Sequence, residues 1–440
     1  MRNKKGSQAP KPGAKKMTSL SQLAGYTEQS EIRVMSVECD KIRGINLAQG
    51  VCDTEVPVEV REGAKTAIDR GMNSYTRMDG IAELRQAISR KMRQYNQIIA
   101  DPEREVVVTS GSTGAFYSAC LALLDPGDEV IIFEPYYGYH VSTLETLQAV
   151  PVYVRLRPTE WEFTAEDLER VITPRTKAIV VNTPANPSGK VFSQTEVEWI
   201  ADCAIRHNLF IFTDEIYEYF VYDGHKHISP GSLSGMAERT ITISGLSKTF
   251  SVTGWRVGYA VCSPRVAAAI GYFHDLVYVC APAPLQHGVA VGLQELTTNF
   301  YRELQQEYLK KRDLICAALE DAGLIPSVPQ GAYYVLADAS SIPGQSSKEK
   351  AMRLLEMAGV AAVPGDAFFH DNAGTNLLRF CFAKTDRELE EACERFRGLL
   401  SRLRSNSTAA KSTAAKSTAA KSTARERMTS TRGKSTSMTR

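Results

Sequence analysis

The sequence predicts an α/β fold, with a mainly parallel seven-stranded sheet flanked by helices in a large domain and a smaller α+β domain beside it. This prediction rests first on short apolar, β-branched runs that alternate with helical patterns through the middle of the chain. The runs are almost continuously apolar, which is typical of strands covered on both faces. The chain has 440 residues, which suits one large and one smaller domain.

The expected elements follow one another in alternating order. The seven expected strands are Val106–Thr109, Val130–Phe133, Val152–Arg155, Ala178–Asn182, Leu209–Thr213, Thr240–Ser244 and Arg256–Val261. Helices are expected between them at Thr113–Leu124, Ala165–Val171 and Thr195–Asn208, and a longer helix is expected at Asn299–Ala322.

These elements indicate a division of the chain into five parts. Residues 51–298 form the large domain, while 28–50 and 299–404 together form the smaller one. Residues 1–27 are basic and are expected to lack a fold. Residues 405–440 repeat the sequence STAAK and have too few apolar side chains to offset the entropy of ordering, so they are expected to be a disordered tail.

Charge is distributed unevenly, although the net charge is only +2. Residues 1–16 carry six cations and no acid, and residues 401–440 carry ten cations and one acid, which leaves a net −13 on residues 17–400. A body this acidic does not offer the basic face that nucleic-acid binding requires, so no nucleic-acid partner is expected.

The nine cysteines show neither a C-x-x-C pair nor metal-ligand spacing, and they indicate free thiols in a reducing compartment. No apolar run approaches the ~20 residues that span a bilayer, so no membrane partner is expected. A cytoplasmic location follows as the expectation. The basic, acid-free N-terminus leaves an organellar targeting segment as the alternative.

The first motif, Thr109-Ser-Gly-Ser-Thr-Gly114, follows an expected strand and opens an expected helix. Small residues let the backbone approach an anion, and the helix N-terminus supplies free N–H groups. Ser112 and Thr113 add hydroxyl donors. The motif predicts a phosphate cradle, with an ordinary capped helix start as the alternative.

Two further motifs stand at the ends of the next strands. Asn182-Thr-Pro-Ala-Asn-Pro-Ser-Gly189 is a rigid loop that could present Asn186 as a hydrogen-bond donor, or it is a plain turn. Thr213-Asp-Glu-Ile-Tyr217 places Asp214 at the end of an apolar strand, where a carboxylate needs a cationic or donor partner. Tyr217 can reach the same space.

The fourth motif, Ser244-Gly-Leu-Ser-Lys-Thr-Phe-Ser-Val-Thr-Gly-Trp-Arg256, follows a strand. A lysine close to another cation, as Lys248 is to Arg256, is a candidate for a lowered pKa and for Schiff-base chemistry. Taken alone, Lys248 could equally be a surface amine. Together the four motifs offer an anion site, a carboxylate, a hydroxyl, an amide and an amine, which are the groups that a pyridoxal phosphate requires.

In this order the motifs SGST, NPSG, DEIY, SKTFSVTGWR and LRF resemble those of the class I and II aminotransferases, which are fold-type I pyridoxal-phosphate enzymes. The likeness covers about residues 30–400. It implies pyridoxal 5'-phosphate as cofactor, an amino acid and a 2-oxo acid as substrates, and a homodimer.

The resemblance also implies roles for individual residues. The implied catalytic residues are Lys248, which would bind the cofactor aldehyde, Asp214, which would pair with the pyridinium nitrogen, and Tyr217, which would donate to the ring oxygen. The implied cofactor-binding residues are these three together with Gly111, Ser112, Thr113, Tyr137, Asn186, Ser244, Ser247, Arg256 and, from the neighbouring subunit, Tyr75. The implied substrate-binding residues are Gly50, Asn186 and Arg379, the last as a clamp on the α-carboxylate.

The loop after Gly50 departs from the family pattern. The family usually has Glu-Pro-Asp-Phe after this glycine, whereas this chain has Val-Cys-Asp-Thr-Glu, so the choice of substrate stays open. No second arginine for a dicarboxylate side chain can be placed from the sequence. The alternative activity is elimination at a sulfur amino acid or another lyase reaction with the same cofactor. A non-catalytic regulator built on this fold is the alternative from a different class.

His225 and His227 form a His-x-His pair after the Asp214 strand. With neither a cysteine nor a paired acid nearby in the sequence, a role in stabilising the loop is expected rather than a metal site.

Overall fold

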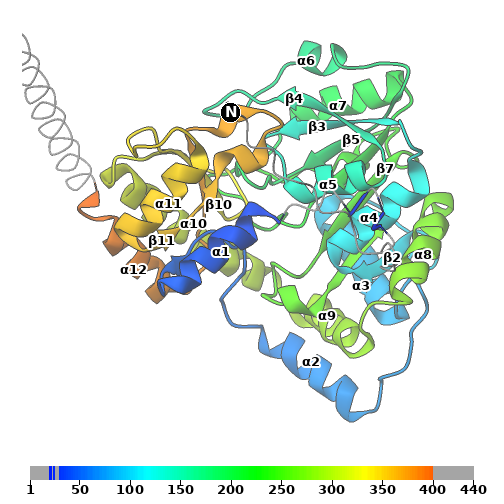
Figure 1. Ribbon diagram of the computed structural model, residues 1–440. Coiled ribbons are helices and arrows are strands. Elements are labelled where there is room, and N and C mark those ends of the chain that lie inside the picture. The colour runs from blue at the N-terminus through cyan, green and yellow to red at the C-terminus, as the bar shows by residue number, and fades with distance from the viewer. Residues whose placement is uncertain (1–18, 22, 25–28, 400–440) are drawn as a thin grey trace, which may run out of the picture.

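The computed structural model describes residues 19–21, 23–24 and 29–399. The basic segment 1–27 lies almost wholly, and the tail 405–440 wholly, outside these residues. The described chain has two halves, which Figure 1 shows as a large sheet flanked by helices and a smaller sheet region beside it. The predicted fold class is therefore confirmed.

The large sheet contains seven strands. They are β2 (Val106–Ser110), β3 (Glu129–Glu134), β4 (Val150–Arg155), β5 (Thr176–Asn182), β6 (Phe210–Asp214), β7 (Thr240–Gly245) and β8 (Val257–Val261). Their order across the sheet is β2-β8-β7-β6-β5-β3-β4. Only β8 runs against its neighbours, β2 and β7, so the sheet is mainly parallel as expected. Each strand lies within two residues of its predicted bounds.

Alternate side chains of the central strands enter two different hydrophobic clusters. On β3, Val130 and Ile132 belong to the cluster beneath α4 (Gly111–Leu123), α5 (Gly138–Thr146) and α8 (Pro264–Tyr278). Ile131 and Phe133 belong to the cluster that includes α7 (Gln194–Arg206). Both faces of these strands are buried, which is why their sequence is apolar at nearly every position.

Capping residues explain where two of the expected helices begin. Ser193 accepts a hydrogen bond from the Glu196 amide and its own amide donates one to the Glu196 carboxylate, a capping box that starts α7. Thr164 and Asp167 form the same box at α6 (Ala165–Glu169). The helices α2 (Val58–Asp69), α3 (Ala82–Lys91) and α9 (Ala283–Glu295) were not among the expected elements, and α2 packs against α9.

The smaller half contains a four-stranded antiparallel sheet in the order β12 (Val363–Pro364), β13 (Leu377–Cys381), β10 (Tyr334–Asp338), β9 (Ile325–Ser327). Its helices are α10 (Thr298–Asp321), α11 (Ser347–Ala358) and α12 (Asp386–Phe396). The N-terminal helix α1 (Glu31–Lys41) and β1 (Ile45–Asn46) join this half, because β1 pairs with β11 (Val360–Ala361). Figure 1 shows α1 beside α11 and β11.

Within the described residues, none of the helices combines the length and the apolar character that a membrane crossing demands. All nine cysteines lie in this part of the chain and are free thiols.

Candidate active site

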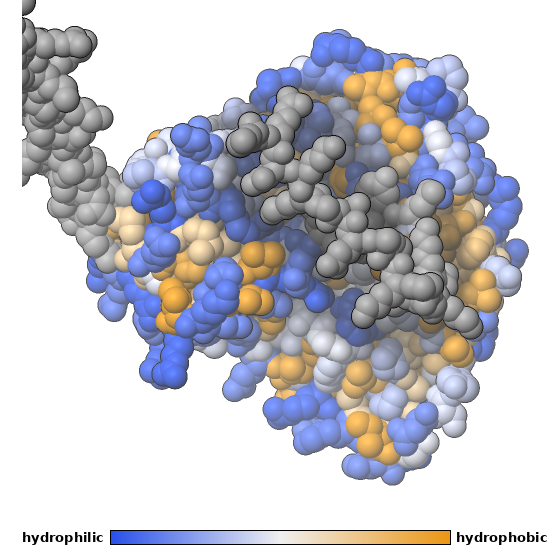
Figure 2. All heavy atoms as spheres, viewed as in Figure 1, coloured by the Kyte–Doolittle hydropathy of each residue, from blue (hydrophilic) through white to orange (hydrophobic). Residues whose placement is uncertain are grey.

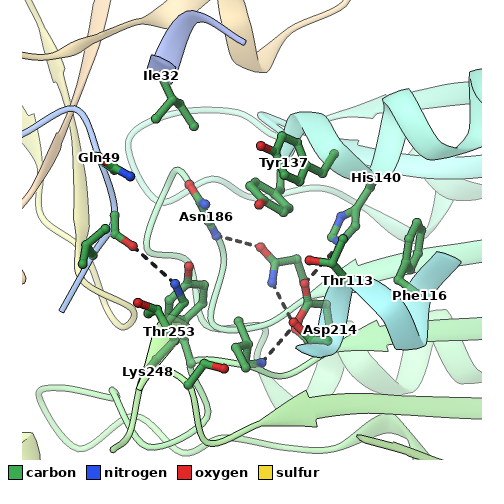
Figure 3. A pocket seen from close by; sticks show the side chains of 18 of the residues that line it. Ile32, Gln49, Thr113, Phe116, Tyr137, His140, Asn186, Asp214, Lys248 and Thr253 are labelled. Carbon is green, nitrogen blue, oxygen red and sulfur yellow. Dashed lines mark hydrogen bonds and ion pairs between the residues drawn. The ribbon is translucent and has the colours of Figure 1, made fainter. Parts of the chain in front are cut away.

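A cavity of about 600 Å³ lies where the two halves meet, at the carboxyl ends of β5 and β6. Figure 3 shows Lys248, Asp214, Asn186 and Tyr137 around it, with Ile32 of α1 on the far side. Eleven of the residues predicted from the sequence line this one cavity. They are Gly50, Ser112, Thr113, Tyr137, Asn186, Asp214, Tyr217, Ser247, Lys248, Arg256 and Arg379.

The start of α4 forms an open cradle of backbone amides beside a guanidinium. Gly111 has φ +71°, and a Cβ there would lie 2.5 Å from Nη2 of Arg256. Gly258 of β8 lies just as close, since a Cβ there would lie 2.4 Å from the Ser112 amide nitrogen. Arg256 is oriented by donating from Nη1 to the Thr253 carbonyl at 2.9 Å. Free amides at a helix N-terminus together with an arginine are suited to a phosphate group.

Asp214 ends β6 and is mostly buried. One oxygen, Oδ2, lies 3.1 Å from Nε2 of His140, and the other accepts from the Ile216 amide at 3.3 Å. Phe116 packs on the His140 ring, with a centroid distance of 4.6 Å. The partner that the strand-end carboxylate was expected to need is therefore His140, which the sequence analysis did not find. Its only signal is a histidine in the first turn of the helix that follows Tyr137.

Hydrogen bonds connect the loop after β5 to the site. The side chain of Asn182 donates to the Asp214 carbonyl at 3.0 Å and accepts from the Asn186 amide at 2.7 Å. Asn186 in turn accepts from Nη1 of Arg379 at 2.9 Å. The Asn186 side chain thus lies between the large sheet and the arginine of the smaller one.

Arg379 on β13 is fully buried. Its Nη2 donates to the Ala48 carbonyl at 2.5 Å, and its guanidinium lies over the rings of Tyr334 and Phe368, at 4.5 and 5.1 Å from their centroids. Its Nε has no hydrogen-bond partner among the described residues. A guanidinium buried in a cavity wall, with no carboxylate of the described chain against it, favours binding of an external anion.

The Lys248 side chain is half-buried in the cavity wall, and its Nζ donates to the Gly50 carbonyl at 3.3 Å. Burial lowers the pKa of Lys248 below its ordinary value, and the charge of Arg256 lowers it further. An amine with a lowered pKa is more often in the neutral, nucleophilic form. Gly50 cannot be replaced without movement, because a Cβ there would lie 1.9 Å from the Tyr334 hydroxyl oxygen.

Three tyrosines, Tyr137, Tyr217 and Tyr334, complete the cavity wall near the carboxylate. The hydroxyl groups of Tyr217 and Tyr334 lie 3.1 Å apart. Tyr137 meets His140 edge to face, with ring centroids 5.3 Å apart. Burial raises the pKa of Tyr217 and of Tyr137 well above the ordinary value, so both hydroxyl groups keep their protons and can donate them in hydrogen bonds.

Three of the predicted residues do not line the cavity. Gly111 packs against the guanidinium of Arg256 but is outside the cavity lining. Ser244 is buried, and its hydroxyl donates to the Glu218 carboxylate at 2.8 Å and to the Glu215 carbonyl at 3.2 Å. Tyr75 is 83% exposed in this single chain.

A second group of ionisable side chains is buried next to the segment from Asp214, at the end of β6, to Tyr217. Glu218 pairs with Lys91 at 2.5 Å, and Glu215 lies 2.8 Å from Nε2 of His227. Asn96 donates to both carboxylates, at 3.1 and 2.8 Å. His227 therefore has acidic partners that its own loop does not supply, because they come from the residues that follow the preceding strand. Ligand atoms of Glu215, Glu218 and His227 lie within 4.8 Å of one another.

The chain is similar to aminotransferases along most of its length. Residues 42–396 match the family model described as aminotransferase class I and II. Aromatic-amino-acid aminotransferase 2 of Thermococcus litoralis is 35% identical over 385 residues, which cover 87% of this chain and 98% of the relative. Aspartate aminotransferase of Pyrococcus abyssi is 36% identical with the same coverage. The solved structure of N-succinyldiaminopimelate aminotransferase from Mycobacterium tuberculosis has a TM-score of 0.83 at 35% identity and covers 87% of this chain and 100% of that chain.

Proposed function

Because the chain belongs to the aminotransferase class I and II family and is an aminotransferase, we propose that it binds pyridoxal 5'-phosphate in the 600 Å³ cavity and uses Lys248 for catalysis. The observation that carries this proposal is the position of Lys248, a half-buried amine with a lowered pKa in the cavity wall. It shares one cavity with the paired carboxylate of Asp214 and the unmatched guanidinium of Arg379.

The cavity residues fit this cofactor group by group. The amides at the start of α4, with Arg256 and the hydroxyls of Ser112, Thr113 and Ser247, suit a phosphate. Asp214 is the only Asp or Glu among the described residues that line the cavity, and it suits a protonated ring nitrogen. The hydroxyl of Tyr217 and the amide of Asn186 suit the ring oxygen, and Tyr137 supplies an aromatic face for the ring.

Bound pyridoxal phosphate supplies an electron sink that stabilises negative charge at the substrate Cα. The residues of the chain then hold the reactants and move the proton. With the cofactor bound, the Lys248 amine would lie near the substrate Cα and would serve there as the base that holds and moves its proton. Asp214, oriented by His140, would pair with the ring nitrogen and favour its protonated form. Arg379 binds the α-carboxylate through two parallel hydrogen bonds, which places Cα within reach of Lys248.

Loss of the cofactor spectrum in one lysine variant tests this proposal. Purified wild-type protein with added pyridoxal phosphate is expected to show a visible absorbance band that Lys248→Ala abolishes. Lys310→Ala is the matched control, because Lys310 is exposed on α10, far from Lys248 in the sequence and outside the lining of this cavity. An identical band in Lys248→Ala would refute the role of this lysine.

The same preparation distinguishes transamination from elimination. An amino acid should shift the band to that of the aminated cofactor, and a 2-oxo acid should restore it. The relatives described above are all named as aminotransferases, and they support this cycle over the lyase alternative. Release of ammonia and a thiol without the cycle would contradict it.

We also propose that two copies of this chain assemble and that Tyr75 reaches the neighbouring cofactor phosphate. Exposed apolar side chains gather in two stretches of the chain. One is residues 58–78, from α2 through the loop that carries Tyr75, and the other is residues 272–279, at the end of α8. Figure 2 shows part of this hydrophobic surface over α2, at the bottom of the view. Sedimentation equilibrium should give twice the 48.5 kDa chain mass. Tyr75→Phe should weaken cofactor affinity without changing the mass, and a monomer that retains full activity would refute the assembly.

The names of the relatives cover aromatic amino acids, aspartate and an N-succinylated diamino acid. Family membership therefore does not specify which chemical group stands at the side-chain end of the substrate.

A further inference from the structure

The cavity carries more positive than negative charge. Four of its lining residues are Lys or Arg, namely Arg33, Lys248, Arg256 and Arg379, and one, Asp214, is an acid. A cavity with such an excess attracts anionic ligands and holds them most tightly where each cation meets its own anionic group.

Three of these cations already have a role in the proposed function. Arg256 lies against the amide cradle at Gly111 and suits the cofactor phosphate. Arg379 is oriented by Asn186 and Ala48 for the α-carboxylate. Lys248 is the amine, and Asp214 is paired with His140. Among the described residues, Arg33 is the one lining cation that these groups leave without an anion.

The helix α1 presents Arg33 to the cavity. Met35 and Cys39 are fully buried on the face of α1 that packs on the smaller half. Arg33 lies two residues before Met35, about 200° away around the helix, so it is on the opposite side from that face. An ion pair between Glu31 and Lys348 joins the first turn of α1 to α11. Figure 3 shows the neighbouring Ile32 extending from this wall toward the cavity.

The Arg33 side chain is exposed, and it forms neither an ion pair nor a hydrogen bond with any residue that the structure describes. The sequence alone could not place a second arginine near the substrate. The fold does so by placing the first turn of α1 in the cavity wall, some 200 residues from Lys248 along the chain.

We propose that Arg33 binds a second carboxylate at the distal end of the substrate, so that this enzyme prefers a dicarboxylic amino acid and a dicarboxylic 2-oxo acid. The inference rests on the proposed function and names its substrate class. A dicarboxylic substrate adds one negative charge beyond the phosphate and the α-carboxylate, and the planar guanidinium of Arg33 can bind it through two hydrogen bonds. A monocarboxylic substrate leaves Arg33 unmatched in the cavity.

Substrate selectivity of the holoenzyme tests this assignment. We measure the second-order rate constant of the half-reaction in which glutamate, or separately alanine, converts the absorbance band of the holoenzyme, and we take the ratio of the two. Arg33→Met should lower this ratio about tenfold or more, because it keeps most of the length of the side chain but removes its charge. Arg33→Lys should restore part of the ratio. The control is Lys41→Met, which removes one charge from the other end of α1, outside the cavity lining, and should leave the ratio at the wild-type value.

A binding measurement gives a readout that is independent of turnover. Calorimetric titration of the holoenzyme with glutarate, and separately with butyrate, compares a dicarboxylate with a monocarboxylate of similar length. Arg33→Met should weaken glutarate binding about tenfold or more and should remove most of its advantage over butyrate. An unchanged glutarate affinity, or an equal loss for both acids, would overturn the assignment.

Failure of the assignment can be told apart from failure of the proposed function. A holoenzyme that is converted by alanine but keeps its glutamate preference after Arg33→Met refutes the role of Arg33 alone. A protein that no amino acid converts refutes the proposed function and, with it, the substrate class.

Discussion

Replacement of Lys91 by methionine tests whether the buried charge network beneath the active-site loop stabilises the fold. Lys91 and Glu218 form an ion pair at 2.5 Å, with side chains only 6% and 2% exposed. Lys91→Met keeps most of the side-chain volume but leaves the Glu218 carboxylate buried without its cation. Breaking a buried pair in this way costs about 3–5 kcal/mol, because the remaining charge is uncompensated.

This loss is large beside a typical total stability of about 5–15 kcal/mol. Burial by itself raises the pKa of Glu218, but Lys91 and His227 lower it more, and the net pKa is below the ordinary value. A carboxyl group whose folded pKa is lowered stabilises the fold above its unfolded pKa of about 4.3, and this contribution is lost as the pH falls through the folded pKa. The measurement therefore belongs at pH 7, where the full effect is present.

Urea unfolding of the wild type and three variants gives the free energies. Lys91→Met should lose about 3–5 kcal/mol, and Lys91→Met combined with Glu218→Gln should recover more than half of that, since the amide needs no counter-charge. The control is Lys65→Met, which breaks an exposed pair with Glu62 at 2.9 Å and should cost less than about 1 kcal/mol. A Lys91→Met variant within about 1 kcal/mol of wild type, or a double variant no better than the single, would refute the reasoning.

Three further outcomes follow from close contacts and burial. Gly50→Ala should raise KM for the amino acid at least tenfold while circular dichroism stays unchanged, because its Cβ would lie 1.9 Å from the Tyr334 hydroxyl oxygen and displace that ring. Gly258→Ala should weaken pyridoxal-phosphate affinity, measured by equilibrium dialysis, because its Cβ would press on the amide cradle at Ser112. The pKa of His274 is lowered to about 4 by burial, so unfolding free energy should fall by up to about 3 kcal/mol as the pH drops from 6.5 toward 4. A His274→Gln variant should lose this pH dependence, and a pH profile like that of wild type would exclude the histidine as its source.

The strands of the large sheet could be predicted closely from the sequence, whereas several helices could not. Strands buried on both faces are short, apolar and β-branched, and that signal stands out against polar surroundings. Helices α2 and α9 each begin directly after a proline, at Pro57 and Pro282. Proline is a recognised start signal at the first helical position, but these two prolines stand one residue earlier, and neither helix has the capping serine or threonine that marks α6 and α7.

Some residues of the candidate site could likewise be predicted from the sequence, and others could not. Lys248, Asp214 and Asn186 lie in short motifs, so their residue types and spacing are enough to suggest their chemistry. His140 and Arg33 have no motif. Each is placed by contacts with elements distant in the sequence. His140 meets a carboxylate 74 residues away, and Arg33 lies on α1, which packs with β11 and β12 of the smaller half. Contacts of that kind are set by tertiary packing, which sequence spacing does not encode.

Ser244 shows how strand periodicity could have sharpened the prediction for one residue. Side chains on a strand alternate between the two faces, and β7 reads Thr240, Ile241, Thr242, Ile243, Ser244. The two isoleucines enter the hydrophobic cluster beneath α4, so Ser244 belongs with the threonines on the other face. There its hydroxyl meets Glu218 rather than the cavity. Ser247 lies beyond the end of the strand, is free of this alternation, and lines the cavity. Of the two serines offered to the phosphate, the alternation therefore favours Ser247 as the ligand and assigns Ser244 to the charge network that Lys91→Met perturbs.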